Sequence, residues 1–156
     1  MVYVSGDILT PVMDFEERPV IVCHQVNCKG VMGSGLAKQV RNKFPWVYDY
    51  YRKRCEAGYA CLGQVQVCSV LLEAGYLVAN VFGQDGFGRG VLHTNYNALR
   101  RAFTYLAQGY SNYIFRIPYK MGCGLGGGDW AIVESIIKET LCDKDIEVEI
   151  WRLDCD

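Results

Sequence analysis

The stretch VIVCHQVNCKGVMGSGLAKQVRNKF, residues 20–44, decides the fold class. It begins with a continuous apolar run, Val20 to His24, which is typical of a strand covered on both faces. A glycine-punctuated loop follows, and from Leu36 apolar residues recur at helical spacing. A buried strand that passes through a glycine loop directly into a helix predicts an α/β domain.

The rest of the chain predicts further strands and helices. Strands are expected over 2–5, 64–70, 76–82, 113–118 and 146–153, and helices over 36–44, 46–56, 94–108 and 129–141. Residues 73–75 predict a hairpin turn, so the strands beside it should run antiparallel. Pro45 should end the first helix, and Thr94 or Asn95 should cap the third. This order predicts a mixed sheet with helices on both faces, built as one domain over residues 1–156.

Composition narrows the possible partners and the location. Of the 156 residues, 51% are hydrophobic and 21% charged, and the net charge is −1. The overall charge therefore does not indicate nucleic-acid binding, although a local basic patch is compatible with this composition. Residues 1–7 do not read as a signal peptide, and no apolar run approaches the roughly 18 residues of a membrane span. We expect a soluble, cytoplasmic protein without a membrane partner.

The eight cysteines are interpreted as reduced core residues. None forms a C-x-x-C pair, and several lie inside apolar runs, such as Cys23 and Cys68. Without a secretory signal a disulfide framework is not expected. A zinc site would need closer pairs and more histidine than His24 and His93 supply. The sequence therefore predicts neither a metal site nor a cofactor.

Two glycine loops predict a site for a phosphate-bearing ligand. The first runs from Asn27 to Gly35, where glycines expose backbone N–H groups and a helix N-terminus adds positive potential. It is neither a Walker A sequence nor a G-x-G-x-x-G, so a plain strand-to-helix turn is the alternative. The second follows the strand ending at Pro118 and has five glycines in the seven positions 122–128, too costly in chain entropy for a turn alone. Together they predict two walls of one cleft.

A third glycine run, residues 82–90, also follows an expected strand. It could cover the cleft or form a long surface loop, and the sequence does not choose between them.

The whole chain resembles the macrodomain family. Residues 4–9, with Gly6, Asp7 and Ile8, look like that family's first strand and turn. Residues 24–37 look like its first ligand loop, and residues 118–130, with "GCGL" at 122–125, look like its second. The likeness is greatest to the subgroup of terminal ADP-ribose protein glycohydrolases and ADP-ribose 1''-phosphate phosphatases. It implies a three-layer α/β/α sandwich that binds ADP-ribose.

The resemblance also implies roles for individual residues. Asp7 would accept a hydrogen bond from the adenine amino group beside the Ile8 backbone, Trp151 would lie near the adenine, and Asn27 would face the distal ribose. The two phosphates would lie against two sets of residues: Gly33, Ser34 and Gly35, and Gly122, Cys123, Gly124, Leu125 and Gly126.

Each assignment has a structural alternative. Asp7 could be a turn residue, Trp151 a packed strand residue, and Asn27 a cap for its own loop. His24 could be a histidine with its hydrogen bonds satisfied at a strand end rather than an acid–base group.

Two departures from the subgroup bear on mechanism. Its nucleophilic lysine is replaced here by Gln84 or the neighbouring Asp85, and glutamine cannot form a Schiff base. The acidic residue after "GCGL" is replaced by Gly126, and the nearest carboxylate, Asp129, is expected to cap the following helix.

Two leading hypotheses follow. The first is a metal-free hydrolase of ADP-ribose derivatives, in which the ligand's phosphate and Asn27 position a water and His24 or Asp85 transfers a proton. The alternative is a non-catalytic reader of ADP-ribose. A weaker possibility is nucleic-acid binding by the basic and aromatic residues 38–54, whose alternative is a solvated helix face.

Overall fold

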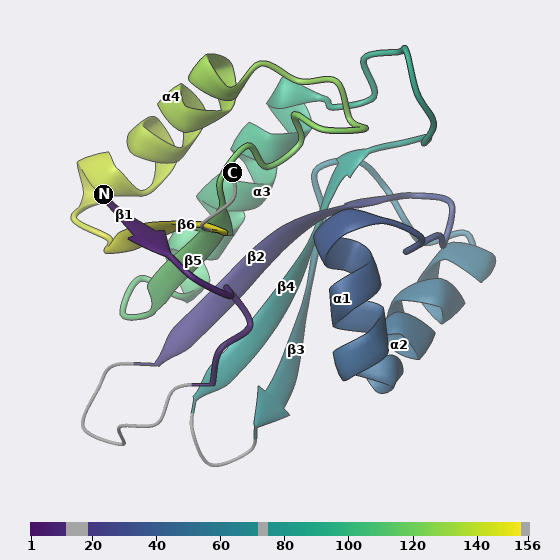
Figure 1. The fold of residues 1–156 in the computed structure, drawn as a ribbon, viewed down its shortest axis with the longest axis horizontal. Helices are drawn as coiled ribbons and strands as arrows, with labels where there is room; N and C mark the ends of the chain where they lie inside the picture. Colours follow the sequence, from purple (N-terminus) through teal and green to yellow (C-terminus); the bar gives the residue numbers. More distant parts are fainter. Residues whose placement is uncertain (12–18, 72–74, 154–156) are drawn as a thin grey trace.

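A six-stranded sheet runs through the middle of the computed structural model, which describes residues 1–11, 19–71 and 75–153 (Figure 1). Its strands are β1 (Val2–Ser5), β2 (Val20–Asn27), β3 (Val65–Leu71), β4 (Tyr76–Gln84), β5 (Ile114–Pro118) and β6 (Val148–Arg152). The order across the sheet is β1-β6-β5-β2-β4-β3. Every neighbouring pair is parallel except β3 and β4, which run antiparallel. The predicted mixed sheet is confirmed.

Helices cover both faces of this sheet. Helices α1 (Gly35–Lys43) and α2 (Pro45–Glu56) lie on one face, and α3 (Tyr96–Gly109) and α4 (Trp130–Thr140) on the other, followed by the short η1 (Cys142–Lys144) (Figure 1). Strand β2 is covered by helices on both faces, which explains why its apolar run is continuous. Ile21 packs in the cluster that contains α3 and α4, whereas Val20 and Val22 pack with Val40 of α1. The domain is a three-layer α/β/α sandwich.

Local signals place the helix ends. Pro45 occupies the first turn of α2, where a missing N–H costs nothing. The Asn95 side chain accepts a 2.9 Å hydrogen bond from the Ala98 N–H and caps α3, which decides between the two predicted caps. Asp129 accepts from the Ala131 N–H in the same way, so its predicted capping role is confirmed.

Strand ends differ from the expectation by a few residues. β2 and β4 continue to Asn27 and Gln84, which pair across a bulge, because the parallel ladder extends past the apolar run. The last strand spans Val148–Arg152, shorter than residues 146–153. Of the expected hairpin turn only Gly75 is described, and residues 73 and 74 lie outside the described ranges.

The cysteines behave mainly as core residues. All seven described cysteines are unpaired thiols, and six of them belong to or pack against the three apolar clusters, Cys61 being exposed. Cys155 lies outside the described residues. Within the described ranges, no helix combines the length and apolarity that crossing a bilayer requires.

The topology brings three loops to one edge. Because β2, β4 and β5 are parallel neighbours, their carboxyl ends and the segments that follow them lie at the same edge of the sheet. These segments are the two glycine loops and the third glycine run.

Candidate functional site

A cleft of about 700 Å³ opens at this edge. One wall is residues 27–37, the other is residues 118–126, and the segment 87–89 contributes its rim. The prediction that the two glycine loops face each other is therefore met by the geometry, and the third glycine run lies at the cleft rather than apart from it. A cleft at the carboxyl ends of parallel strands is where open α/β sheets bind ligands.

The first loop is shaped by the side chain of Asn27. Its Oδ1 accepts hydrogen bonds from the N–H groups of Lys29 (2.9 Å) and Val31 (3.4 Å), and its Nδ2 donates to the Val31 carbonyl (2.8 Å). The buried Tyr51 hydroxyl, from α2, lies 2.7 Å from the Asn27 carbonyl oxygen and accepts from the Gly30 N–H at 3.2 Å. Asn27 thus caps its own loop, although it also lines the cleft.

Helix α1 points its N-terminus into the cleft. Ser34 occupies the cap position, yet its side chain makes no capping hydrogen bond. Gly35, Leu36 and Ala37, in the first turn, all line the cleft. The first-turn N–H groups of a helix have no intrahelical acceptors, so they offer aligned donors to an anion.

The second loop is held by backbone contacts. The Gly126 carbonyl accepts hydrogen bonds from the N–H groups of His93 (2.8 Å) and Thr94 (3.0 Å), and the Gly128 N–H donates to the Gly122 carbonyl at 2.8 Å. The Thr94 hydroxyl also donates to that carbonyl, at 2.6 Å. The loop is consequently tied to the segment that precedes α3.

A side-chain network that the sequence did not reveal joins the strands beneath the cleft. Gln25 Nε2 donates to Gln84 Oε1 at 2.7 Å and to Thr94 Oγ1 at 2.9 Å, and Gln84 Nε2 donates to the Gly86 carbonyl at 2.7 Å. Gln84 is therefore a structural link between β2 and the third glycine run. In the sequence, Gln25 and Gln84 appear only as polar residues in otherwise apolar strands, and this pattern does not identify the groups to which they bind.

His24 lies in the cleft floor and is buried. Asn80 Nδ2 donates to Gln66 Oε1 at 3.0 Å, so Asn80 Oδ1 accepts from His24 Nε2 at 2.6 Å. Burial lowers the pKa of His24 to about 4, even though the Asn80 hydrogen bond opposes the shift. The ring is neutral at pH 7, and its Nδ1 has no hydrogen-bond partner in the described structure.

The structure separates the remaining predicted residues into two groups. Those lining the cleft besides Asn27 and His24 are Gly33, Ser34, Gly35, Gly122, Gly124, Leu125 and Gly126. Those that do not line it are Asp7, Ile8, Asp85, Cys123 and Trp151.

The residues outside the cleft have contacts of their own. The Asp85 carboxylate pairs with Lys29 Nζ at 3.5 Å, and Asp7 Oδ1 accepts from the Leu9 N–H at 2.9 Å in a turn. Trp151 stacks 4.6 Å from the Arg116 guanidinium and donates through Nε1 to Glu149. These contacts agree with the structural alternatives for Asp7 and Trp151, while an adenine contact by either stays a prediction.

The charge of the cleft is one-sided. Among the described residues that line it, Arg89 and Lys120 are cationic and none is a carboxylate. In a chain of net charge −1, this arrangement creates a local positive potential that favours an anionic ligand.

The basic segment on α1 and α2 is largely engaged within the protein. Arg52 pairs with Glu56 at 2.9 Å and with Asp49 at 3.7 Å, and Arg41 stacks on the Tyr48 ring at 4.1 Å. Such contacts fit a solvated helix face better than a free surface for nucleic acid.

Comparisons with known proteins show which proteins this chain resembles. No family model matches the chain. A DNA ADP-ribosyl glycohydrolase of Mycobacterium tuberculosis is 37% identical over 65 residues, 42% of this chain and 17% of that protein. An ADP-ribose 1''-phosphate phosphatase of Scheffersomyces stipitis is 35% identical over 54 residues, 35% of this chain and 31% of that protein. The aligned segments thus span less than a third of these two relatives.

Structural similarity extends over the whole domain. A macrodomain protein from Streptomyces coelicolor superimposes with a TM-score of 0.79 and 27% identity, over 97% of both chains. The sheet order, the two helical layers and the edge cleft define a three-layer α/β/α domain with a cleft at the carboxyl ends of its parallel strands. The chain belongs to the macrodomain family.

Proposed function

We propose that this chain binds ADP-ribose in the cleft and hydrolyses an ADP-ribose derivative there. The observation that carries the binding proposal is the combination of two facing glycine loops, an uncapped helix N-terminus and two cations, with no carboxylate among the described lining residues. Such a surface offers backbone donors and positive charge from both sides, which suits a diphosphate. The two relatives described above are named as an ADP-ribose 1''-phosphate phosphatase and a DNA ADP-ribosyl glycohydrolase.

The ligand would lie across the strand ends. The diphosphate would contact Gly33–Gly35 on one side and Gly122–Gly126 on the other. The adenine would extend toward β1 and β6, where Asp7 and Trp151 lie, and the distal ribose toward Asn27 at the end of β2. The strand order β1-β6-β5-β2 supports this direction, because it sets the adenine residues and Asn27 on opposite sides of β5.

For the hydrolysis, the available groups favour direct attack by water. Gln84 stands where the subgroup has its lysine and is held by Gln25 and Gly86, so no lysine adduct can form at this position. Asp85 is paired with Lys29, and the Asn27 side chain is used by its own loop. Of the three candidates this leaves neutral His24, although its unpartnered Nδ1 is buried, and the ligand's phosphate would orient the attacking water.

A second candidate function is a reader that binds ADP-ribose without chemistry. One observation favours it: none of the described residues that line the cleft is a carboxylate, and the one imidazole there is a weak base. The two functions share the same binding site and differ only in turnover.

Titration calorimetry with ADP-ribose, beside AMP and ADP, tests the binding proposal. Micromolar binding of ADP-ribose and much weaker binding of the two controls supports it, and no binding of ADP-ribose overturns it. A panel of ADP-ribosylated substrates then separates enzyme from reader. A hydrolase should lose turnover in His24→Asn while keeping its affinity for ADP-ribose, whereas a reader shows no turnover in either form.

A further inference from the structure

A buried arginine fastens the turn that carries Asp7 to the sheet. Arg116 lies on β5, and its Nη1 donates to the carbonyl oxygen of Ile8 at 3.2 Å and to that of Thr10 at 2.7 Å. These two residues are 108 and 106 positions away in the sequence. A buried carbonyl without a donor is costly, so the shape of the turn depends on this one side chain.

Lys43, at the end of α1, holds the same turn from another element. Its Nζ donates to the Leu9 carbonyl oxygen at 3.1 Å, and the Thr10 N–H donates to the Asp7 carbonyl oxygen at 3.0 Å. The carbonyl oxygens of residues 7–10 thus all accept hydrogen bonds, three of them from cationic side chains. Strand β5 and helix α1 together fix the backbone of this turn.

One planar peptide links Arg116 to the Asp7 carboxylate. The carbonyl group of Ile8 and the N–H group of Leu9 belong to the same peptide unit, and they point in opposite directions because the unit is planar and trans. Arg116 holds the carbonyl side, whereas Asp7 Oδ1 accepts from the N–H side at 2.9 Å. A rotation of this unit would break one contact or the other, so Arg116 sets the direction of the carboxylate without touching it.

Arg116 also contacts two residues of β6. Its guanidinium lies 4.6 Å from the Trp151 ring centroid, and its Nε lies 3.6 Å from Glu149 Oε1, the oxygen to which Trp151 Nε1 donates at 3.1 Å. A Cβ added at Gly6 would lie 3.3 Å from the Trp151 ring, so this ring also packs against the residue before Asp7. Arg116 therefore joins the two residues that are proposed to lie near the adenine.

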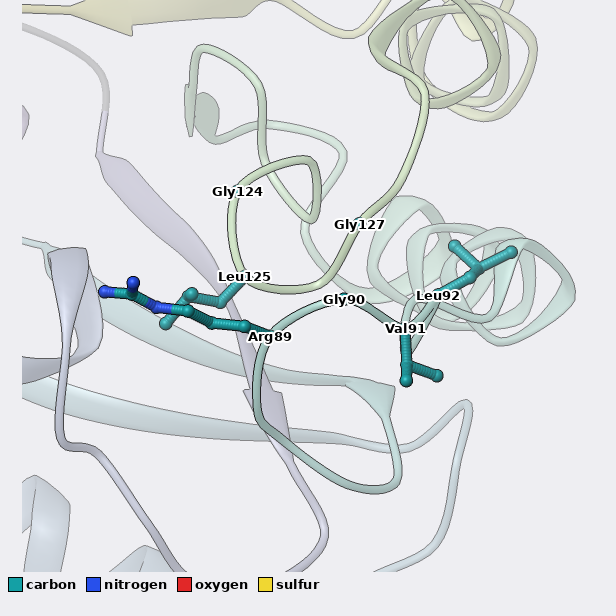
Figure 2. Close-up of a pocket in the computed structure, with 7 residues that line it drawn as sticks. All are labelled: Arg89, Gly90, Val91, Leu92, Gly124, Leu125 and Gly127. Atoms are coloured by element: carbon teal, nitrogen blue, oxygen red, sulfur yellow. The ribbon is translucent and has the colours of Figure 1, made fainter.

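The arginine at the rim of the cleft has a different position. Figure 2 shows the Arg89 side chain extending beside that of Leu125 from the second glycine loop. Arg89 is exposed and lines the cleft, whereas Arg116 is buried and does not line it. Arg89 can attract an anionic ligand directly, but Arg116 can act only through the residues that it holds.

We propose that Arg116 is a positioning residue for recognition of the adenine base. It holds turn 7–10 in the shape that directs the Asp7 carboxylate at the amino group of the base, and Lys43 supports it. This inference rests on the proposed function, because it takes the place of the adenine from it. A base without that amino group should gain nothing from Arg116.

The test uses two ligands that differ only in the base, ADP-ribose and inosine diphosphate ribose, whose hypoxanthine carries an oxygen in place of the amino group. By titration calorimetry the wild type should bind ADP-ribose about tenfold more tightly, since the Asp7 carboxylate accepts from an amino group and repels an oxygen. Arg116→Met removes the donors but keeps a long side chain. It should bind ADP-ribose about tenfold more weakly than the wild type and inosine diphosphate ribose equally well.

A merely structural role of Arg116 predicts a different result. General damage to the cleft would weaken both ligands by the same factor and leave their ratio unchanged. That outcome overturns the inference, as does equal affinity of the wild type for the two ligands.

Arg89→Met is the matched control. Removal of this exposed cation from the rim should weaken both ligands alike and keep the preference for adenine, because both carry the same diphosphate. Loss of the preference in this control too would show that any lost positive charge has the same effect, which also overturns the inference.

Lys43→Met decides the question if Arg116→Met does not fold. Lys43 is exposed, so its substitution should leave the domain folded, and the preference should fall about threefold, because Lys43 holds the peptide unit next to the one that contacts Asp7. Lys53→Met removes an exposed lysine of α2 and should keep the full preference. An unchanged preference in Lys43→Met then overturns the inference.

A double-mutant cycle checks that Arg116 acts through Asp7. Asp7→Ala should remove the preference by itself, and addition of Arg116→Met should cause no further loss of affinity for ADP-ribose. Losses that multiply independently overturn the inference. Failure of the wild type to bind ADP-ribose at all refutes the proposed function itself, so the two failures are distinguishable.

Discussion

The two walls of the cleft use glycine for opposite reasons. In the first loop, a Cβ added at Gly33 would meet only Val31, at 3.6 Å, and one at Gly35 would meet nothing within 4 Å. In the second loop, a Cβ at Gly126 would lie 2.5 Å from Thr94 Oγ1 and 2.7 Å from the Gly122 carbonyl oxygen. The glycines facing the cleft in the first loop keep space open for a ligand, while Gly126 lets backbone segments pack against each other.

The walls also differ in what holds them. The first is fixed by side chains, Asn27 and Tyr51, that saturate its backbone groups. The second is fixed by backbone contacts with residues 93 and 94 and by the Thr94 hydroxyl. Substitution of Gly126 in the second wall should therefore affect folding first, and substitutions at the open glycines of the first wall should affect binding first.

The largest effect is expected for Gly126→Ala. The new methyl would overlap the Gly122 carbonyl, so the loop must move and the free energy of unfolding should fall by about 3 kcal/mol. For a chain of this size the Tm should drop by roughly 6–12 °C. Thermal unfolding measures this, with Gly124→Ala as the control, because a Cβ there meets nothing within 4 Å. Equal Tm values for the two variants would contradict the packing role.

Acid should lower the free energy of unfolding through His24, which lies on the strand that leads into the first wall. The pKa of His24 is about 4 in the folded protein and about 6.5 when unfolded, so the unfolded state binds the extra proton as the pH falls between these values. The stabilising contribution is complete above pH 6.5 and is lost toward pH 4. Between pH 7 and pH 4.5 the free energy of unfolding should fall by roughly 2–3 kcal/mol more in the wild type than in His24→Asn. Denaturant unfolding at both pH values tests this, and parallel pH profiles would refute it.

Tyr51→Phe should cost about 1.5 kcal/mol of unfolding free energy. The substitution keeps the ring but leaves the buried Gly30 N–H without its acceptor and the Asn27 carbonyl without its donor. Urea unfolding is the measurement. Tyr105→Phe is the control, since Tyr105 is exposed on α3, and it should be neutral. A neutral Tyr51→Phe would show that the first loop keeps its shape without side-chain support.

The smallest effect on stability is expected for Gly33→Ala, within about 0.5 kcal/mol of the wild type, because its Cβ has room. Its methyl would project where a phosphate approaches the backbone, so the Kd for ADP-ribose should rise about tenfold. Calorimetry measures the Kd, with Gly109→Ala at the end of α3 as the control. An unchanged Kd would mean that this wall does not contact the ligand.

Much of the fold was predictable because its signals are local. The apolar run at 20–24, the proline at 45 and the caps Asn95 and Asp129 act on residues within a few positions, so they can be interpreted without knowing the topology. The ends of β2 and β4 were less predictable, since Asn27 and Gln84 join the sheet only by pairing with each other.

The candidate site was predictable only in part. Glycines after strands indicated two walls, and parallel strands placed them at one edge. The pairing of Asp85 with Lys29, the burial of His24 and the position of Arg89 over the rim depend on segments far apart in the chain.

The sequence by itself determined the elements, their order and the backbone positions that must be glycine-rich, because strand periodicity, helix capping and turn chemistry act over short spacings. Only the tertiary structure decided which polar side chains remain free. The Asn27–Tyr51 and Gln25–Thr94 contacts join residues 24 and 69 positions apart, and they exist because strand order and helix packing bring those residues together. The same packing leaves the exposed Arg89 guanidinium at the cleft without a protein partner among the described residues, whereas His24 Nδ1, which also lacks a partner, is buried.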